Sequence, residues 1–279
     1  MEAILVPVIS VTTMGVVLSA ILCIASKLMY VKTDERVAQL LECLPGVNCG
    51  VCGYPGCSGY ATALGSDKNI KNNLCTPGGN AVMTKLCAIL GVEAGSAVTP
   101  KYAVVHCGGD CTSRQKKMNY RGILSCVAAK QVCGGDGACS FGCLGYGDCQ
   151  KVCPTNAVNI VNGLARIDPE LCTGCGLCVK TCPSKMITIE DANIPVVFLC
   201  NSIEKGAIVR KKCAKGCIVC GKCVRACMSG AITLEDHLVK IDHEKCSLCG
   251  GCAEVCVTGT IRHTAVKTGN TNRAKGESL

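Results

Sequence analysis

Cysteines at regular intervals are the residues of this chain that could do chemistry. The 279-residue sequence holds 29 of them, and C-x2-C and C-x3-C spacings recur along it. Disulfides impose no such period, whereas a metal or an iron–sulfur cluster gathers several thiolates around one centre. The spacing therefore predicts cysteine-ligated metal sites, and metal binding would supply part of the folding energy.

A duplicated cysteine pattern carries the strongest prediction. An offset of 74 residues superimposes the eight cysteines from Cys139 to Cys182 on eight of those from Cys213 to Cys256. Chance does not produce such a register, so two copies of one unit are expected. Each copy contains C-x2-C-x2-C-x3-C, the run of bacterial two-cluster ferredoxins, in which the fourth cysteine serves the other cluster. Each copy should be a small α+β unit of two short helices and a hairpin around two [4Fe-4S] clusters.

Crossed ligation predicts two clusters in each copy. In the first copy, cluster 2 would take Cys139, Cys143, Cys149 and Cys182, and cluster 3 would take Cys172, Cys175, Cys178 and Cys153. In the second copy, cluster 4 would take Cys217, Cys220, Cys223 and Cys256, and cluster 5 would take Cys246, Cys249, Cys252 and Cys227. Tyr146 is the counterpart of Cys220, so Cys213 competes with Cys220 for one position. Cys220 is preferred because it restores the x2-x2 spacing.

A separate motif nearer the start of the chain predicts cluster 1. Its C-x2-C-x4-C spacing, interleaved with glycines, lets the backbone turn tightly around one centre, and a fourth cysteine arrives from a distance. The proposed ligands are Cys49, Cys52, Cys57 and Cys75. A four-thiolate zinc site has similar ligands, but the neighbouring ferredoxin pattern favours iron. A zinc-ribbon array is the corresponding alternative for the duplicated region.

Four further cysteines leave two interpretations open. Cys107, Cys111, Cys126 and Cys133 are spaced x3, x14 and x6, which matches no established motif. They could bind a sixth [4Fe-4S] cluster or be scattered free thiols. Cys23, Cys87 and Cys200 are interpreted as small buried hydrophobic residues, and Cys43 as a free thiol.

An apolar segment near the start of the sequence predicts a transmembrane helix. Residues 3–26 carry no charge and match the roughly 20 residues that span a bilayer. Lys27, Lys32 and Arg36 follow, which by the positive-inside rule places the later residues in the cytoplasm. A cleaved signal peptide is the alternative, but this segment begins with an acidic residue and is long.

The formal charge of +9 does not indicate a nucleic-acid partner. Five or six clusters, each roughly −2 with its thiolates, would bring the net charge to about −1 to −3. The sequence also lacks G-x-G-x-x-G after a strand and G-x-x-x-x-G-K-[ST]. The chain is therefore expected to reach NAD only through another subunit. No catalytic acid or base is predicted, and the histidines, His106 among them, are interpreted as surface or loop residues.

The order of these features resembles the B subunit of the Rnf electron-transport complex over nearly the whole chain. The resemblance implies a relay that accepts electrons from soluble reduced ferredoxin and passes them to other membrane subunits of the complex, which reduce NAD and move Na+ or H+. It also implies the cytoplasmic membrane of a bacterium. Alternatives are the related complex that keeps a redox-sensing regulator reduced, an accessory iron–sulfur protein for a corrinoid centre, and a purely structural metal array.

The expected fold class is α+β, with one transmembrane helix, a small four-iron domain and two tandem ferredoxin-like units. The predicted boundaries are 1–27 for the helix, 28–95 for the four-iron domain, 96–134 for a cysteine-rich linker, 135–195 and 196–265 for the ferredoxin-like units, and 266–279 for a disordered tail.

Overall fold

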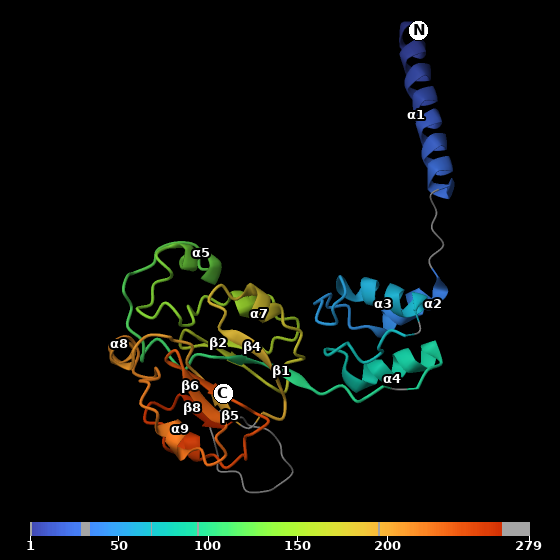
Figure 1. Ribbon diagram of the computed structural model, residues 1–279. Helices are drawn as coiled ribbons and strands as arrows, with labels where there is room; N and C mark the ends of the chain where they lie inside the picture. Colours follow the sequence, from blue (N-terminus) through green and yellow to red (C-terminus); the bar gives the residue numbers. More distant parts are fainter. Residues whose placement is uncertain (1, 29–33, 68, 94, 195, 264–279) are drawn as a thin grey trace.

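The computed structural model describes residues 2–28, 34–67, 69–93, 95–194 and 196–263. Figure 1 shows a long N-terminal helix, a small helical domain, and a larger part that holds all the strands of the described residues. The expected α+β class is confirmed. The predicted tail, 266–279, lies outside the described residues.

The apolar segment forms helix α1, Glu2–Leu28, as predicted. Its 20-residue stretch Val8–Lys27 is long and apolar enough to cross a bilayer, and none of it is buried against the rest of the protein. The Thr12 hydroxyl donates a hydrogen bond to the Val8 carbonyl (2.9 Å) and the Thr13 hydroxyl to the Ile9 carbonyl (2.8 Å). Both polar side chains therefore find partners within the helix, as an apolar solvent requires.

Three helices form the domain that carries the first cysteine motif. They are α2 (Glu35–Cys43), α3 (Gly56–Ser66) and α4 (Gly79–Leu90). In α2, Leu40 is fully buried against Tyr60, Leu64 and Leu86. The Tyr60 hydroxyl donates to the Lys71 carbonyl (2.7 Å), which satisfies the one polar atom of that buried ring. An apolar core thus supports the cysteine loop between α2 and α3.

The first ferredoxin-like unit has the predicted helix pair and hairpin. The helices are α6 (Asp148–Lys151) and α7 (Leu177–Thr181), and the hairpin joins β2 (Val158–Val161) to β3 (Leu164–Ile167). Its turn has positive φ at Asn162 (51°) and Gly163 (69°), as the Asn-Gly signal predicts. Strand β4 (Ile187–Asp191) pairs with β1 (Lys101–Val105), so a strand from the expected linker completes this unit.

The second unit repeats this plan. Its helices are α9 (Lys222–Ala226) and α10 (Gly251–Glu254), and its hairpin joins β6 (Ile232–Glu235) to β7 (Leu238–Ile241). Strand β5 (Val196–Phe198) pairs with β8 (Ile261–His263) as β1 pairs with β4. In the larger part of the described chain, α5 (Cys126–Gln131) and α8 (Gly206–Lys212) have no counterpart in the other unit.

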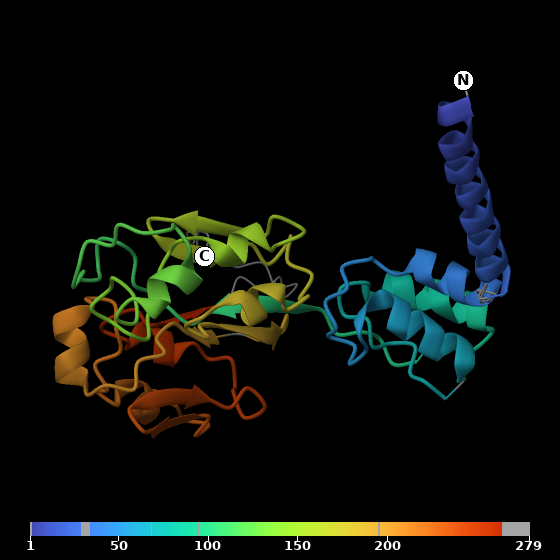
Figure 2. The same cartoon turned by 90° about the horizontal axis from the view of Figure 1, so that it is seen from above.

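The two units meet along an apolar seam. Tyr102 and Val104 of β1 pack against Ile194, Val197 and Leu199, which lie between the units. In Figure 2 the yellow-green hairpin of the first unit and the orange-red hairpin of the second lie at opposite edges of the larger part, with β1 between them. The seam also contains hydrogen bonds, because the His106 ring contacts the Phe198 carbonyl and the Thr188 hydroxyl, both at 2.7 Å. His106 lies in the loop that follows β1, in agreement with its interpretation as a surface or loop residue, and its partly buried ring bridges β4 and β5.

Gly145 is required because another backbone segment approaches it. A Cβ at this position would overlap the Gly163 carbonyl oxygen, and φ is +80°. Its counterpart in the second unit is Val219, at φ 57°, so the positive φ by itself accepts a side chain. We expect Gly145→Ala to lower the free energy of unfolding by about 4 kcal/mol or more.

The matched control is Gly134→Ala. Gly134 has φ +76° with nothing within 4 Å of an added Cβ, so only the backbone cost of about 1–2 kcal/mol is expected. The measurement is anaerobic urea unfolding of the full chain, followed by the visible absorption of the clusters. Equal shifts in the two variants would show that the approach of Gly163 does not constrain this turn.

Candidate iron–sulfur sites

The cysteine loop between α2 and α3, together with the segment before α4, forms the first site. Burial raises the pKa of the Cys75 thiol, and the neighbouring Cys57, Cys49 and Cys52 thiols raise it further. The four predicted ligands of cluster 1 therefore lie together. The Asn48 side-chain oxygen accepts a hydrogen bond from the Cys57 N–H (2.8 Å), which ties the two ends of the loop.

The predicted ligands of cluster 3 are also neighbours. Burial and the nearby Cys172, Cys175 and Cys153 thiols raise the pKa of Cys178 to about 12. At Cys153 burial acts in the same direction, but hydrogen bonds from the Thr155 hydroxyl and backbone N–H groups outweigh it and lower the pKa. Donors aimed at sulfur favour the thiolate, which is the form that binds iron.

The second unit repeats this arrangement around the predicted ligands of cluster 5. Burial raises the pKa of Cys252, and the Cys246 and Cys249 thiols add to the effect. Cys227 packs against the same apolar core as Cys252. The pKa of Cys227 is lowered, chiefly by the Ser229 hydroxyl, the counterpart of Thr155. A side-chain hydroxyl thus donates a hydrogen bond to the equivalent cysteine, Cys153 or Cys227, in both copies.

One cavity of the second unit contains all four cysteines that were preferred for cluster 4. They are Cys217, Cys220, Cys223 and Cys256. The competing residue, Cys213, lines a different cavity, at the seam between the units. This placement supports the preference for Cys220.

The equivalent cavity of the first unit contains Cys126 where Cys139 was predicted. Its cysteines are Cys126, Cys143, Cys149 and Cys182. Cys126 begins α5, and the buried Asp148 carboxylate holds that end by accepting hydrogen bonds from the Ser125 hydroxyl (2.8 Å) and the Val127 N–H (3.0 Å). The predicted grouping of Cys139 with the other three is thus not the one that the structure brings together.

The predicted sixth set is dispersed. Cys107 is partly buried and lines the seam cavity, Cys126 lines the cavity of cluster 2, and Cys111 and Cys133 are exposed. Cys200, interpreted as a small hydrophobic residue, is buried and lines the seam cavity. Cys43 and Cys87 pack in the helical domain, and Cys23 is exposed on α1.

The spacing of the side chains bears on which metal these sites suit. Within the described parts of the chain, no three His, Cys, Asp or Glu side chains lie close enough to hold a single ion. Zinc needs four thiolates at about 2.3 Å from one atom. A four-iron cluster places its thiolates on separate iron atoms and therefore holds them further apart. Zinc thus requires its ligands to converge on one point, whereas a four-iron cluster does not.

Comparison with known proteins identifies the cofactor and the family. A model described as "Putative Fe-S cluster" matches residues 44–77, a "4Fe-4S binding domain" matches residues 165–188, and a "4Fe-4S dicluster domain" matches residues 216–260. The chain is 41% identical over 248 residues to the B subunit of the Na(+)-translocating ferredoxin:NAD(+) oxidoreductase complex of Acetobacterium woodii, covering 88% of this chain and 74% of that protein. It belongs to the family of Rnf B subunits.

Two other relatives carry related names. The B subunit of the proton-translocating ferredoxin:NAD(+) oxidoreductase complex of Clostridium ljungdahlii is 39% identical, over 78% of this chain and 76% of that protein. The B subunit of the ion-translocating oxidoreductase complex of Methanosarcina acetivorans is 33% identical, over 84% of this chain and 88% of that protein. The predicted resemblance to the Rnf B subunit is confirmed, and the chain binds iron–sulfur clusters.

In this member of the Rnf B-subunit family, the helical domain and the first ferredoxin-like unit touch through their cysteine loops. The Lys180 ammonium of α7 donates a hydrogen bond to the Cys49 carbonyl (2.6 Å). The Cys49 thiol also lies near enough to Cys175 to raise its pKa, although burial is the larger cause. The loops of clusters 1 and 3 are therefore neighbours.

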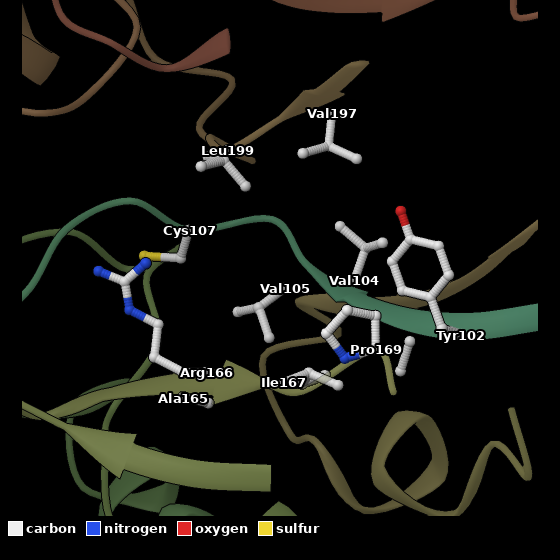
Figure 3. Close-up of a pocket in the computed structure, with 11 residues that line it drawn as sticks. Tyr102, Val104, Val105, Cys107, Ala165, Arg166, Ile167, Pro169, Val197 and Leu199 are labelled. Atoms are coloured by element: carbon white, nitrogen blue, oxygen red, sulfur yellow. The ribbon is translucent and has the colours of Figure 1, made fainter. Parts of the chain in front are cut away.

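An apolar cavity lies near the seam. Figure 3 shows aliphatic side chains such as Val105, Val197 and Leu199 around it, with Cys107 at one end and Tyr102 at the other. Arg166 is the one charged residue among the cavity's lining.

Proposed function

We propose that this chain relays electrons within a membrane-bound ferredoxin:NAD oxidoreductase complex. It would accept electrons from reduced ferredoxin and pass them through [4Fe-4S] clusters to membrane subunits, with NAD reduction and Na+ or H+ translocation carried out elsewhere in the complex. The observation that carries the proposal is the contact between the Lys180 ammonium and the Cys49 carbonyl. It joins the first ferredoxin-like unit to the domain that follows α1.

The position of α1 gives the relay a direction. In the proposal α1 crosses the membrane once, and the basic residues after it keep the cluster-binding domains on the cytoplasmic side. Cluster 1 would then lie nearest the membrane partners. The second ferredoxin-like unit is the furthest along the chain from α1 and would meet the soluble donor.

The ligand sets of five clusters form part of the proposal. Clusters 1, 3, 4 and 5 keep the predicted ligands, with Cys220 in cluster 4. Cluster 2 takes Cys126 in place of Cys139, because Cys126 shares a cavity with Cys143, Cys149 and Cys182. The domain boundaries stay as predicted, except that 101–105 of the linker segment, strand β1, joins the sheet of the first unit.

The alternative functions lack a supporting observation of this kind. The A. woodii and C. ljungdahlii relatives are named for ferredoxin:NAD(+) oxidoreductase complexes. A role in the regulator-reducing complex, or as a corrinoid accessory protein, would need a feature that sets this chain apart from these two relatives. A purely structural array would not require the loops of clusters 1 and 3 to be neighbours.

The test is direct reduction of the full chain, purified anaerobically in detergent, by ferredoxin. Reduced ferredoxin should bleach the visible absorption of the chain, and dithionite defines complete bleaching. Oxidised ferredoxin is the control and should cause no change. Bleaching by dithionite without any by reduced ferredoxin would contradict the proposed donor.

A further inference from the structure

Four cysteines that no ferredoxin-like site uses face one cavity between the two units. They are Cys107, Cys139, Cys200 and Cys213. We propose that these four thiolates bind a further [4Fe-4S] cluster, which connects the two ferredoxin-like units. This ligand set differs from the predicted sixth set and shares only Cys107 with it.

Backbone hydrogen bonds bring the four segments together. The Gly108 N–H donates to the Leu199 carbonyl (2.9 Å), which places Cys107 beside Cys200. Gln115 joins the other pair, because its N–H donates to the Lys212 carbonyl (2.9 Å) and its carbonyl accepts from the Ala138 N–H (2.8 Å).

Gly109 lies between these two pairs. A Cβ on Gly109 would come within 2.9 Å of the Cys213 sulfur and 3.9 Å of the Cys107 sulfur. Both sulfurs therefore lie against the same glycine, where the missing side chain leaves them room.

The internal repeat relates the four cysteines as two equivalent pairs. Cys139 and Cys213 are separated by the 74-residue offset of the repeat. Cys107 and Cys200 each lie two residues after the end of an outer strand, and the last residues of those strands, Val105 and Phe198, pair with Ile187 and Ile261. Ile187 and Ile261 are themselves repeat counterparts. Each unit thus contributes the same two thiols to the cavity.

In both copies another cysteine takes the ligand position that the repeat pattern offers to Cys139 or Cys213. Cys220 completes the cysteines of the cluster 4 cavity, so Cys213 has no role there. Cys126 does the same in the cluster 2 cavity, so Cys139 has none. Cys126 and Cys220 come from unrelated positions, yet both leave an equivalent thiol, that of Cys139 or Cys213, facing the seam.

The surroundings of the cavity suit an anionic cluster. Arg114 and Lys215 are among its lining residues, and no Asp or Glu is. The Arg114 guanidinium is fixed by hydrogen bonds to the Leu144 and Gly163 carbonyls, both 3.2 Å. Positive charge close to the thiolates offsets the negative charge of the cluster.

The cavity lies between the two units, where a cluster would connect cluster 4 to cluster 2. The Cys217 N–H, at a ligand of cluster 4, donates to the Cys200 sulfur (3.4 Å). On the other side the Cys143 N–H, at a ligand of cluster 2, faces the Cys107 sulfur. The bridging cluster would be reduced by one electron from cluster 4 and reoxidised by passing that electron to cluster 2. The ferredoxin donor supplies the electron.

The experiment is iron analysis of single variants of the full chain, purified anaerobically. Cys200→Ala and Cys213→Ala should each lose between about one and four irons per chain, because a damaged four-iron cluster either loses one iron or disassembles. Cys111→Ala and Cys133→Ala are the matched controls and should keep the iron of the parent chain. Electron paramagnetic resonance of the reduced proteins should show one cluster signal fewer only in the first pair.

Two outcomes would overturn the assignment. One is unchanged iron in Cys200→Ala and Cys213→Ala, with loss in Cys111→Ala and Cys133→Ala instead. The other is stoichiometric zinc in the parent chain that disappears in Cys200→Ala. If Cys213→Ala fails to fold, Cys139→Ala tests the same cavity, and retention of all cluster signals there counts against the site. Iron content does not depend on the donor, so failure of ferredoxin to reduce the chain would leave this site standing.

Discussion

Removal of iron from the intact chain is expected to abolish the tertiary structure of both ferredoxin-like units. Their helices α6, α7, α9 and α10 are four or five residues long, and each of their sheets has two strands. Isolated hairpins and helices of this length are marginal in water. Proposed cluster ligands such as Cys149, Cys178, Cys223 and Cys252 are part of the apolar cores, so cluster binding and folding should be coupled.

In iron-free protein we expect α1 to resist protease and the ferredoxin-like units to lose their resistance. After treatment with an oxidant and a chelator, residues 101–263 should be cleaved rapidly, while α1 in its detergent micelle stays protected. Limited proteolysis with mass spectrometry measures both on one sample, and circular dichroism should retain the signal of α1. Chelator without oxidant is the control, because intact clusters release iron slowly. Protection of residues 101–263 in iron-free protein would show that side-chain packing suffices.

The sequence predicted the elements whose signals are local. The apolar α1 segment and the hairpin of each ferredoxin-like unit are determined by neighbouring residues, and each is observed. The repeat then supplied the relation between distant segments, because a shared offset fixes equivalent positions without any knowledge of contacts. The proposed sets for clusters 1, 3, 4 and 5 rest on such patterns. The structure brings together the cysteines proposed for clusters 1, 3 and 4, and for cluster 5 it brings together Cys246, Cys249 and Cys252.

Cys126 could not be placed from spacing because it reaches its cavity by a long-range contact. Its approach depends on Asp148, whose carboxylate binds the start of α5 from another element. A signal was present in Tyr146, since the first copy lacks the counterpart of Cys220 and so needs a thiol from elsewhere. Cys200 could not be recognised as a ligand from sequence, because a lone cysteine in an apolar stretch resembles a core residue. Only the strand pairing shows that it is equivalent to Cys107.

Breaking cluster 3 is expected to isolate cluster 1 from the electron donor. Cys175 is buried and its thiol lies near Cys49, so the proposed cluster 3 is the site of the first ferredoxin-like unit that neighbours the helical domain. In Cys175→Ala, ferredoxin should reduce the clusters of the second unit at the parent rate. Reduction of cluster 1 should fall almost to its rate without donor, because electron tunnelling weakens steeply with distance.

Freeze-quench electron paramagnetic resonance after mixing with reduced ferredoxin separates these events, with cluster 1 identified by the signal missing from Cys57→Ala. Cys111→Ala is the control, since that exposed thiol lines none of the cluster cavities described above. Reduction of cluster 1 at the parent rate in Cys175→Ala would mean that electrons enter the helical domain directly. The contact between the Lys180 ammonium and the Cys49 carbonyl would then hold the domains together without carrying the relay.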